Sequence, residues 1–196
     1  MKLLGFVFDT SPDASAQVRN LINRATSRFF VLRYYSNFMS GNDLRKLYCA
    51  LIRSVLEYSS VTYGPMLTKA QSNDLENVQK KCLRCMYGYQ KTYSELLLES
   101  GLSSLKDRRQ KAILKFAQKA SENQNYHHWF PLNTSNRSSQ RLSGRNKYME
   151  HFARSKRLYN SPLFYMRRLL NGNQDDDEQP HSLVVDFSHV FNDPYA

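Results

Sequence analysis

Basic side chains alternate with aromatic side chains in three stretches of this 196-residue sequence. The stretches run from Arg28 to Tyr35, from Lys80 to Tyr93 and from Lys147 to Tyr165. Cations neutralise the phosphates of nucleic acids, and aromatic rings stack on bases and sugars. The outer faces of helical domains also carry Lys and Arg for solvation. The alternation by itself therefore leaves a binding surface and a solvated surface both open.

Seven cations are the candidates for phosphate contact. Lys80 and Arg84 are one helical turn apart and opposite the apolar stripe of their segment, so both can face a ligand while the helix stays packed. Two further arginines stand at the start of the next long predicted helix. The predicted nucleic-acid-binding residues are Arg28, Arg33, Lys80, Lys81, Arg84, Arg108 and Arg109.

Signatures of catalysis are absent from the sequence. It contains no P-loop, no Gly-rich dinucleotide motif, no nucleophile elbow and no His-Glu-x-x-His zinc motif. Solvation explains the acidic run Asp175–Glu178, and packing explains the pair His127–His128, better than metal binding does. We therefore expect no catalytic residue, no metal, no cofactor and no small-molecule substrate.

The three cysteines predict a compartment rather than a site. Cys82 and Cys85 form a Cys-x-x-Cys pair, which occurs in zinc sites and redox motifs. A structural zinc site needs four ligands, and no second pair lies nearby in the sequence. Both cysteines fall on the apolar face of a predicted helix, and Cys49 lies on another. We expect buried structural thiols in a reducing intracellular compartment, nuclear or cytoplasmic.

The charge distribution favours a polyanionic partner. The chain has 28 Lys and Arg against 17 Asp and Glu, a net charge of +11. Residues 171 to 196 hold six of the acidic side chains and no Lys or Arg, so 28 basic and 11 acidic side chains give the first 170 residues +17. Such a field attracts nucleic acid, and an acidic protein partner or the chain's own tail is the alternative. No apolar run approaches the ~20 residues of a spanning helix, and we expect no membrane partner.

Apolar periodicity and capping residues predict a mainly α-helical fold. A short strand over Leu3–Phe8 precedes the helices. The second helix is predicted to run unbroken to Gly64-Pro65, and the fifth to bury Phe116. The apolar face of the second helix is predicted at Leu44, Leu47, Tyr48, Leu51, Val55 and Tyr58. The helices are predicted from Pro12 to about Ser36–Gly41, from Ser40 to Gly64, from Thr68 to Gly88, from Thr92 to Gly101, from Ser104 to Glu122 and, as a short piece, from Ser161.

Composition divides the chain into four predicted segments. Residues 1–12 hold the strand and a turn, and residues 13–122 form the helical bundle. Residues 123–172 are rich in Asn, Ser, Arg and His and are predicted as a basic, loop-rich extension. Residues 173–196 are predicted to be an acidic disordered tail.

Six motifs follow one another over residues 3 to 171: LLGFVFD, SRFFVLRYYS, LYCALIRSVLEYSSVTYGP, LTKAQSNDLENVQKKCLRCMYG, LLLESGLSSLKDRRQKAILKFAQKA and NSPLFYMRRLLN. In order and spacing they resemble the C-terminal part of non-LTR (LINE-type) retrotransposon reverse transcriptases of the jockey and chicken-repeat kind. The resemblance implies that Leu3–Asp9 is the last palm strand and that the following helices form the thumb. It further implies that residues 123–172 are the family's extension beyond the polymerase.

Three departures from that family limit what the resemblance implies. The aromatic-Ala-Asp-Asp turn that binds two metal ions has no counterpart here, Tyr63 stands where the family often has tryptophan, and the acidic tail is not part of the pattern. The resemblance therefore implies a non-catalytic fragment of an RNA-directed DNA polymerase that binds template–primer or other nucleic acid. A helical interaction module that docks an acidic partner is the alternative.

Overall fold

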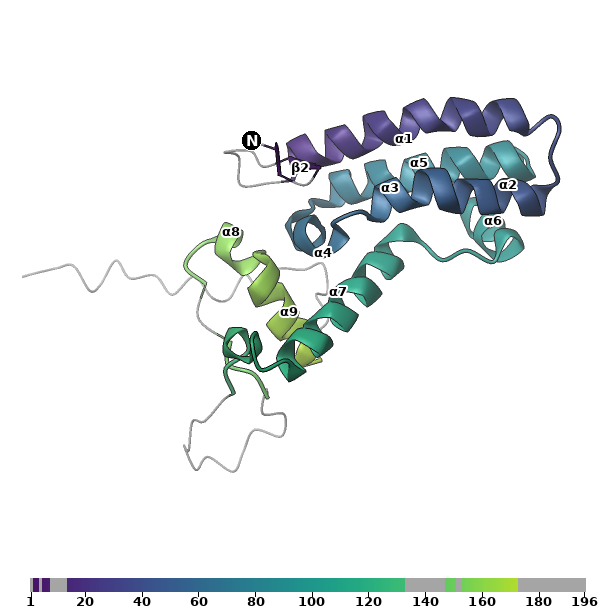
Figure 1. Cartoon of the computed structure of the whole chain (residues 1–196). Coiled ribbons are helices and arrows are strands. Elements are labelled where there is room, and N and C mark those ends of the chain that lie inside the picture. Colours follow the sequence, from purple (N-terminus) through teal and green to yellow (C-terminus); the bar gives the residue numbers. More distant parts are fainter. Residues whose placement is uncertain (1, 4, 8–13, 133–146, 151–152, 173–196) are drawn as a thin grey trace, which may run out of the picture.

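The computed structural model describes residues 2–3, 5–7, 14–132, 147–150 and 153–172, which Figure 1 colours along the sequence. The predicted acidic tail, residues 173–196, lies outside the described residues. So do parts of the predicted segments 1–12 and 123–172.

The described part of the chain is mainly α-helical, which confirms the predicted fold class. None of its helices is long and apolar enough to cross a membrane. The α-helices are α1 (Ser15–Tyr35), α2 (Gly41–Tyr48), α3 (Ser54–Glu57), α4 (Ser60–Tyr63), α5 (Lys69–Tyr87), α6 (Tyr93–Ser100), α7 (Leu105–Glu122), α8 (Lys156–Tyr159) and α9 (Pro162–Leu170). Three other helical turns are η1 (Cys49–Arg53, π), η2 (Gly64–Met66, 3-10) and η3 (His127–Trp129, 3-10).

Four helices begin at the predicted capping residues. In each, the side-chain oxygen of the cap accepts the backbone N–H three residues further on, at Ser40, Thr68, Thr92 and Ser104. The capping box is complete at Thr68 and Thr92, because Gln71 and Glu95 accept the backbone N–H of the cap. At Ser40 the carboxylate of Asp43 instead accepts the serine hydroxyl, at 2.7 Å.

The first hydrophobic core lies between α1, α5 and the α2–α3 stretch. These helices run side by side in Figure 1. The predicted apolar stripes of α1 and α5 face each other, and each stripe repeats at three- and four-residue steps. The buried members of the two stripes are Val18, Leu21, Ala25 and Leu32 in α1, and Leu75, Val78 and Cys82 in α5.

The π-helical turn η1 rotates the face that the second predicted helix buries. A π turn holds more residues than an α turn, so side chains after it are shifted around the helix axis. Ile52 and Leu56 are fully buried in consequence, although the α-helical pattern did not place them in the core. Tyr58, a predicted core residue, is 43% exposed. Beyond the π turn the predicted apolar face is therefore wrong at Tyr58, whereas Val55 is buried as predicted.

The prediction of one unbroken helix up to Gly64-Pro65 is also wrong. Helix α3 ends at Glu57, and Ser59 takes a left-handed conformation with φ of 57° before α4 begins. The hydroxyl of Tyr63, itself fully buried, donates to the carbonyl of Leu56 and holds α4 against the end of α3. A buried tyrosine that needs an acceptor for its hydroxyl is thereby satisfied at the bend.

The predicted N-terminal strand is a two-stranded hairpin instead. Strand β1 (Lys2–Leu3) pairs antiparallel with β2 (Phe6–Val7), and Gly5 adopts φ of +82° between them. Glycine tolerates this φ at little cost, so it divides the apolar run in two. The backbone N–H of Val7 donates to the buried side chain of Gln17, 2.9 Å away, which fixes the hairpin to α1.

A second hydrophobic core joins α7 to the segments that follow it. Ile113 and Ala117 of α7 pack with Phe130, Tyr148 and Met166. Helix α9 is the short amphipathic piece predicted from Ser161, and Figure 1 shows it beside α7. Phe116, predicted to point inward, is 43% exposed, so that prediction is wrong. The described parts of residues 123–172 thus pack on α7 rather than extending away from it.

Candidate nucleic-acid interface

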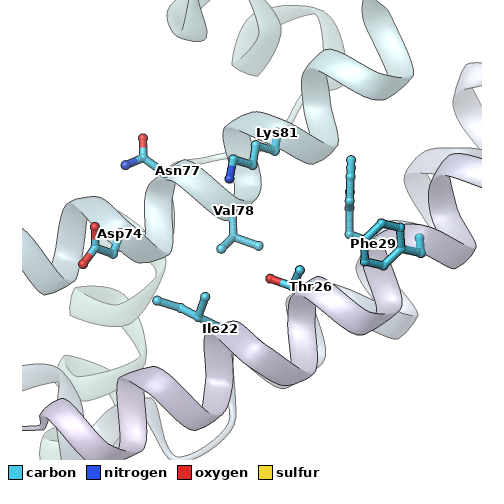
Figure 2. A pocket seen from close by; sticks show the side chains of 8 residues that line it. Ile22, Thr26, Phe29, Asp74, Asn77, Val78 and Lys81 are labelled. Carbon is cyan, nitrogen blue, oxygen red and sulfur yellow. The ribbon is translucent and has the colours of Figure 1, made fainter.

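A groove of about 460 Å³ lies between α1 and α5. Figure 2 shows side chains of the two helices facing each other across it. Its floor is apolar and is formed by Ile22, Phe29 and Val78, which also border the first core. Its rim carries polar and aromatic groups: Thr26, Phe30, Asp74, Asn77 and Lys81. An apolar floor with a few polar groups is the usual make-up of a small-ligand site.

Three side chains of α5 on the groove rim are not bonded to the rest of the described protein. Asp74, Asn77 and Lys81 make no side-chain hydrogen bond or ion pair with any residue that the structure describes. All three are exposed, and their spacing of three and four residues places them on one side of α5. Their donors and acceptors are therefore available to a ligand.

An aromatic ridge continues from the groove along the C-terminal half of α1 and into the turn that follows the helix. We define the ridge as Phe30, Tyr34 and Phe38, which are 62%, 63% and 73% exposed. The rings of Tyr34 and Phe38 lie 5.6 Å apart between centroids. Exposed rings in such a row form a contiguous apolar surface, which commonly marks a binding site.

Two of the seven predicted cations, Arg33 and Lys81, are exposed to solvent near the groove and the ridge. Lys81 stands on the groove rim, and Arg33 is exposed in the last turn of α1, beside the ridge in sequence. Lys80 is only partly exposed. We call the ridge, the groove and these two cations, Arg33 and Lys81, the α1–α5 face.

Two further predicted cations, Arg28 and Arg84, are partly buried. A guanidinium nitrogen of Arg28, Nη1, donates to the carbonyl of Leu51 at 2.6 Å and so ties α1 to the π turn. Arg84 is partly buried, and its Nε is a buried donor with no hydrogen-bond partner among the described residues. Neither side chain presents its whole guanidinium to solvent.

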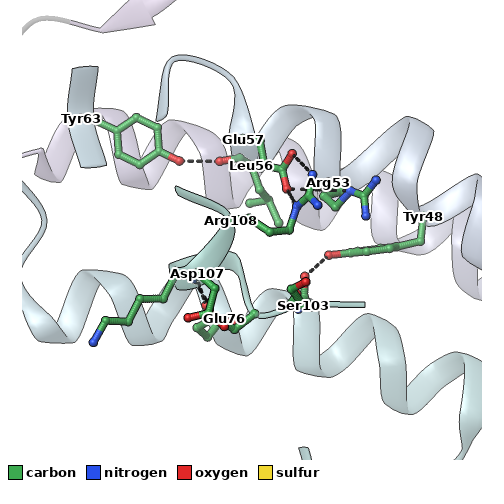
Figure 3. A network of polar contacts seen from close by, with 12 residues as sticks. Tyr48, Arg53, Leu56, Glu57, Tyr63, Glu76, Ser103, Asp107 and Arg108 are labelled. Atoms are coloured by element: carbon green, nitrogen blue, oxygen red, sulfur yellow. Dashed lines mark hydrogen bonds and ion pairs between the residues drawn. The ribbon is translucent and has the colours of Figure 1, made fainter. Parts of the chain in front are cut away.

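The two remaining predicted cations, both in α7, hold elements of the bundle together, and Figure 3 shows the contact of Arg108 with Glu57. Arg108 donates from Nε and Nη2 to the carboxylate of Glu57, with Nη2 3.0 Å from Oε2. Nε of Arg53 lies 3.8 Å from the same carboxylate, and the hydrogen bond that Arg108 donates to Glu57 raises the pKa of Arg108. Arg109 is 4% exposed and donates to the hydroxyl of Ser72 at 2.7 Å.

A buried polar network fixes α5 relative to α2, α6 and α7. The hydroxyl of Tyr48 donates to Gln79, whose amide donates to Tyr93 and to the carbonyl of Ser103. Tyr93 in turn donates to Glu76, and burial followed by this bond raises the pKa of Tyr93. Figure 3 shows the bond from Tyr48 near Ser103. A fully bonded network of this kind makes the helix arrangement specific.

Two arginines that closely follow the third basic–aromatic stretch stabilise the second core. In α9, Arg167 donates to the carbonyl of Trp129 at 2.9 Å, and Arg168 donates to the carbonyl of Tyr159 at 2.7 Å. The guanidinium of Arg168 also lies 3.7 Å from the centroid of the Tyr159 ring, a cation–π contact. Both arginines are buried, so their contacts with these aromatic residues are structural.

Sequence reasoning missed the polar rim of the groove. Asp74 and Asn77 are separated from Lys81 by seven and four residues, so a helical projection of α5 places all three on one side. On α1, Thr26 and Phe30 have the same four-residue spacing. The sequence could not show that these two sides face each other, because that depends on how α1 packs on α5.

Metal and redox sites find no support in the described residues. No group of three or more His, Cys, Asp and Glu side chains gathers there, and all three cysteines are free thiols. Cys82 is fully buried, and burial raises its pKa to about 12. A thiol in this environment is a weak nucleophile.

Comparisons with protein-family models, with curated proteins and with solved structures give no match to this chain.

Proposed function

We propose that this chain binds nucleic acid through the α1–α5 face and acts by binding rather than by catalysis. The observation that carries the proposal is the aromatic ridge, which is solvent-exposed next to Arg33, itself exposed, and Lys81, which forms no ion pair with any described residue. Rings that stack and cations that neutralise phosphate are the two components of sequence-tolerant nucleic-acid surfaces.

The charge of the chain supports the same proposal. The first 170 residues carry a net charge of +17. Part of this charge lies on arginines that are buried in the bundle. These interior charges add to the long-range field even though they touch no ligand. We propose in addition that the mainly helical bundle corresponds to the thumb region of a non-LTR reverse transcriptase, on the strength of the ordered motifs described above.

An acidic protein partner is the second candidate, and the ridge is the observation that favours it. Phe30, Tyr34 and Phe38 together expose an apolar surface of the kind that protein interfaces bury. Charged segments of a partner would then contact Arg33 and Lys81. The two proposals predict different competitors: nucleic acid should displace a ligand bound under the first proposal, and an acidic peptide should displace a ligand bound under the second.

Fluorescence anisotropy with a labelled primer–template separates these proposals. We expect binding that weakens as salt increases, because each neutralised phosphate releases counterions. Unlabelled nucleic acid should displace the label, whereas a polyglutamate peptide should not. Displacement by the peptide at matched charge concentration, or no binding at low salt, would contradict nucleic-acid binding. Extension of a primed RNA template in Mg²⁺ by the purified chain would contradict the non-catalytic role.

A further inference from the structure

We propose that the groove between α1 and α5 binds an unpaired nucleobase, so that the nucleic acid gripped by the α1–α5 face is single-stranded at this point. This inference rests on the proposed function and names its ligand more closely. Its basis is the division of the groove into an apolar floor and a polar rim whose Asp74, Asn77 and Lys81 side chains bond to none of the described residues.

The floor and one wall fit the flat face of a base. Phe29 and Phe30 lie side by side at the groove with ring centroids 6.2 Å apart and planes tilted by 57°. The ring of Phe30 is 62% exposed, so a base can lie against it without displacing a protein side chain. The volume of about 460 Å³ falls within the usual size range of small-ligand sites.

The rim fits the hydrogen-bonding edge of a base. The carboxylate of Asp74 accepts hydrogen bonds, and the amide of Asn77 both donates and accepts. Asn pairs well with the adenine edge, and a carboxylate accepts from the amino group of cytosine. The groove therefore favours bases with an exocyclic amino group over thymine and uracil.

Charge on the rim argues against a duplex in the groove. Lys81 supplies one cation for a phosphate, but Asp74 stands on the same rim and repels a second phosphate strand. In a duplex the base edges are paired and the base faces are stacked, so neither is offered to the groove. An unpaired nucleotide presents its base to the floor and a single phosphate to Lys81.

The test compares three oligonucleotides of equal length on the full chain. They are single-stranded oligo(dC), the same strand with abasic residues in place of nucleotides, and a blunt duplex. We expect the intact single strand to bind about tenfold tighter than the abasic strand, the effect of stacking roughly one base. Equal affinity for the intact and abasic strands would overturn the inference.

Two variants with a matched control locate the effect in the groove. Phe30→Ala should remove most of the preference for the intact strand, whereas Phe116→Ala, the same change at an exposed position of α7, should leave it intact. Asp74→Asn should reduce the preference for oligo(dC) over oligo(dT) while strengthening binding of the abasic strand, since it removes a negative charge. The inference would be overturned if the Phe116 variant lost the preference for the intact strand, or if the Phe30 variant kept it.

The outcomes separate this inference from the proposed function. Salt-dependent binding of the duplex that is as tight as binding of the single strand would overturn the groove inference and leave nucleic-acid binding in place. Absence of binding to all three oligonucleotides would overturn both. An aromatic peptide that binds in the groove while nucleic acid fails to compete would also overturn both.

Discussion

The two hydrophobic cores of this chain bury different sets of ionisable side chains. The first core buries three groups that are neutral when protonated, Tyr48, Tyr63 and Cys82, and one arginine, Arg109, is buried beside it where α7 contacts Ser72 of α5. The second core and its border bury two arginines, Arg167 and Arg168. Residue type alone therefore does not separate a structural cation from a binding cation in this chain. The difference is set by the acceptors that each element brings to the side chain.

Burial acts on these two kinds of group differently. Desolvation disfavours the charged form, so it raises the pKa of Tyr63 and of Cys82 to about 12 and keeps both neutral. It lowers the pKa of Arg167, but an arginine stays charged in a protein at ordinary pH. A buried arginine must therefore find acceptors, and backbone carbonyls at Trp129 and Tyr159 provide them. Nη1 of Arg167 finds none among the described residues.

The largest expected effect is a loss of stability at alkaline pH that originates in the first core. The pKa of Cys82 rises from 9.0 to about 12 on folding. Below pH 9 both states hold the proton, and from pH 9 upward the unfolded state releases it while the folded state keeps it. The free energy of unfolding therefore falls between pH 9 and 12, by on the order of 4 kcal/mol from this thiol. Denaturant titrations at successive pH values measure the slope.

Two cysteine variants test the source of that slope. Cys82→Ala should lower stability at neutral pH, because it leaves a gap in the core, and should make the alkaline loss shallower. Cys85→Ala, at a partly exposed position of the same helix, should keep the slope of the unchanged protein. Identical slopes for the two variants would contradict a contribution from the buried thiol.

A smaller effect is expected from the buried arginines of the second core. Arg168→Lys keeps the charge but loses the planar stack on Tyr159 and its hydrogen-bond geometry. We expect a loss of about 1–2 kcal/mol in the free energy of unfolding, with nucleic-acid binding unchanged. Arg154→Lys makes the same change at an exposed position and should stay within ~0.5 kcal/mol. Equal stability of the two variants would show that the stack contributes nothing.

Local features of the fold were predictable because they depend on short-range chemistry. The caps at Ser40, Thr68, Thr92 and Ser104 and the stripes of α1 and α5 follow from spacing and side-chain type, and the structure confirms them. The π turn and the left-handed Ser59 were not predictable in this way, because the packing of Ile52, Leu56 and Tyr63 selects them. Tertiary contacts overrode the helical pattern at that point.

The candidate site was predictable only in part, for the same reason. Charge and aromatic spacing drew attention to Arg33 and Lys81, which the structure leaves exposed. The same signal also selected Arg28, Arg108 and Arg109, whose acceptors come from residues 23, 51 and 37 positions away in the sequence. Those partners are known only once α1 is packed on the π turn and α7 on the bundle. Whether a cation in a helical protein is available to a ligand can be judged only after its long-range hydrogen-bond acceptors are known.

The surface cations are expected to have the smallest effect on stability and to act on binding alone. Arg33→Ala with Lys81→Ala removes two exposed cations of the α1–α5 face, and exposed Lys or Arg to Ala changes are mild in helices. If both contact phosphate, the slope of log affinity against log salt should flatten by up to ~2. Binding should weaken alike for all sequences at these contacts, because phosphate contacts position a strand without specifying it.

Lys80→Ala with Arg84→Ala is the matched double variant, since it removes the same number of positive charges from positions of α5 that do not line the groove. The long-range field falls equally in both variants, so any difference between their salt slopes measures local contact. We expect the flatter slope for Arg33 with Lys81, because both are exposed, whereas Lys80 and Arg84 are partly buried. Thermal melts exclude unfolding as the cause of lost binding. Equal slopes would mean that only net charge matters, and a flatter slope for Lys80 with Arg84 would move the interface away from the groove.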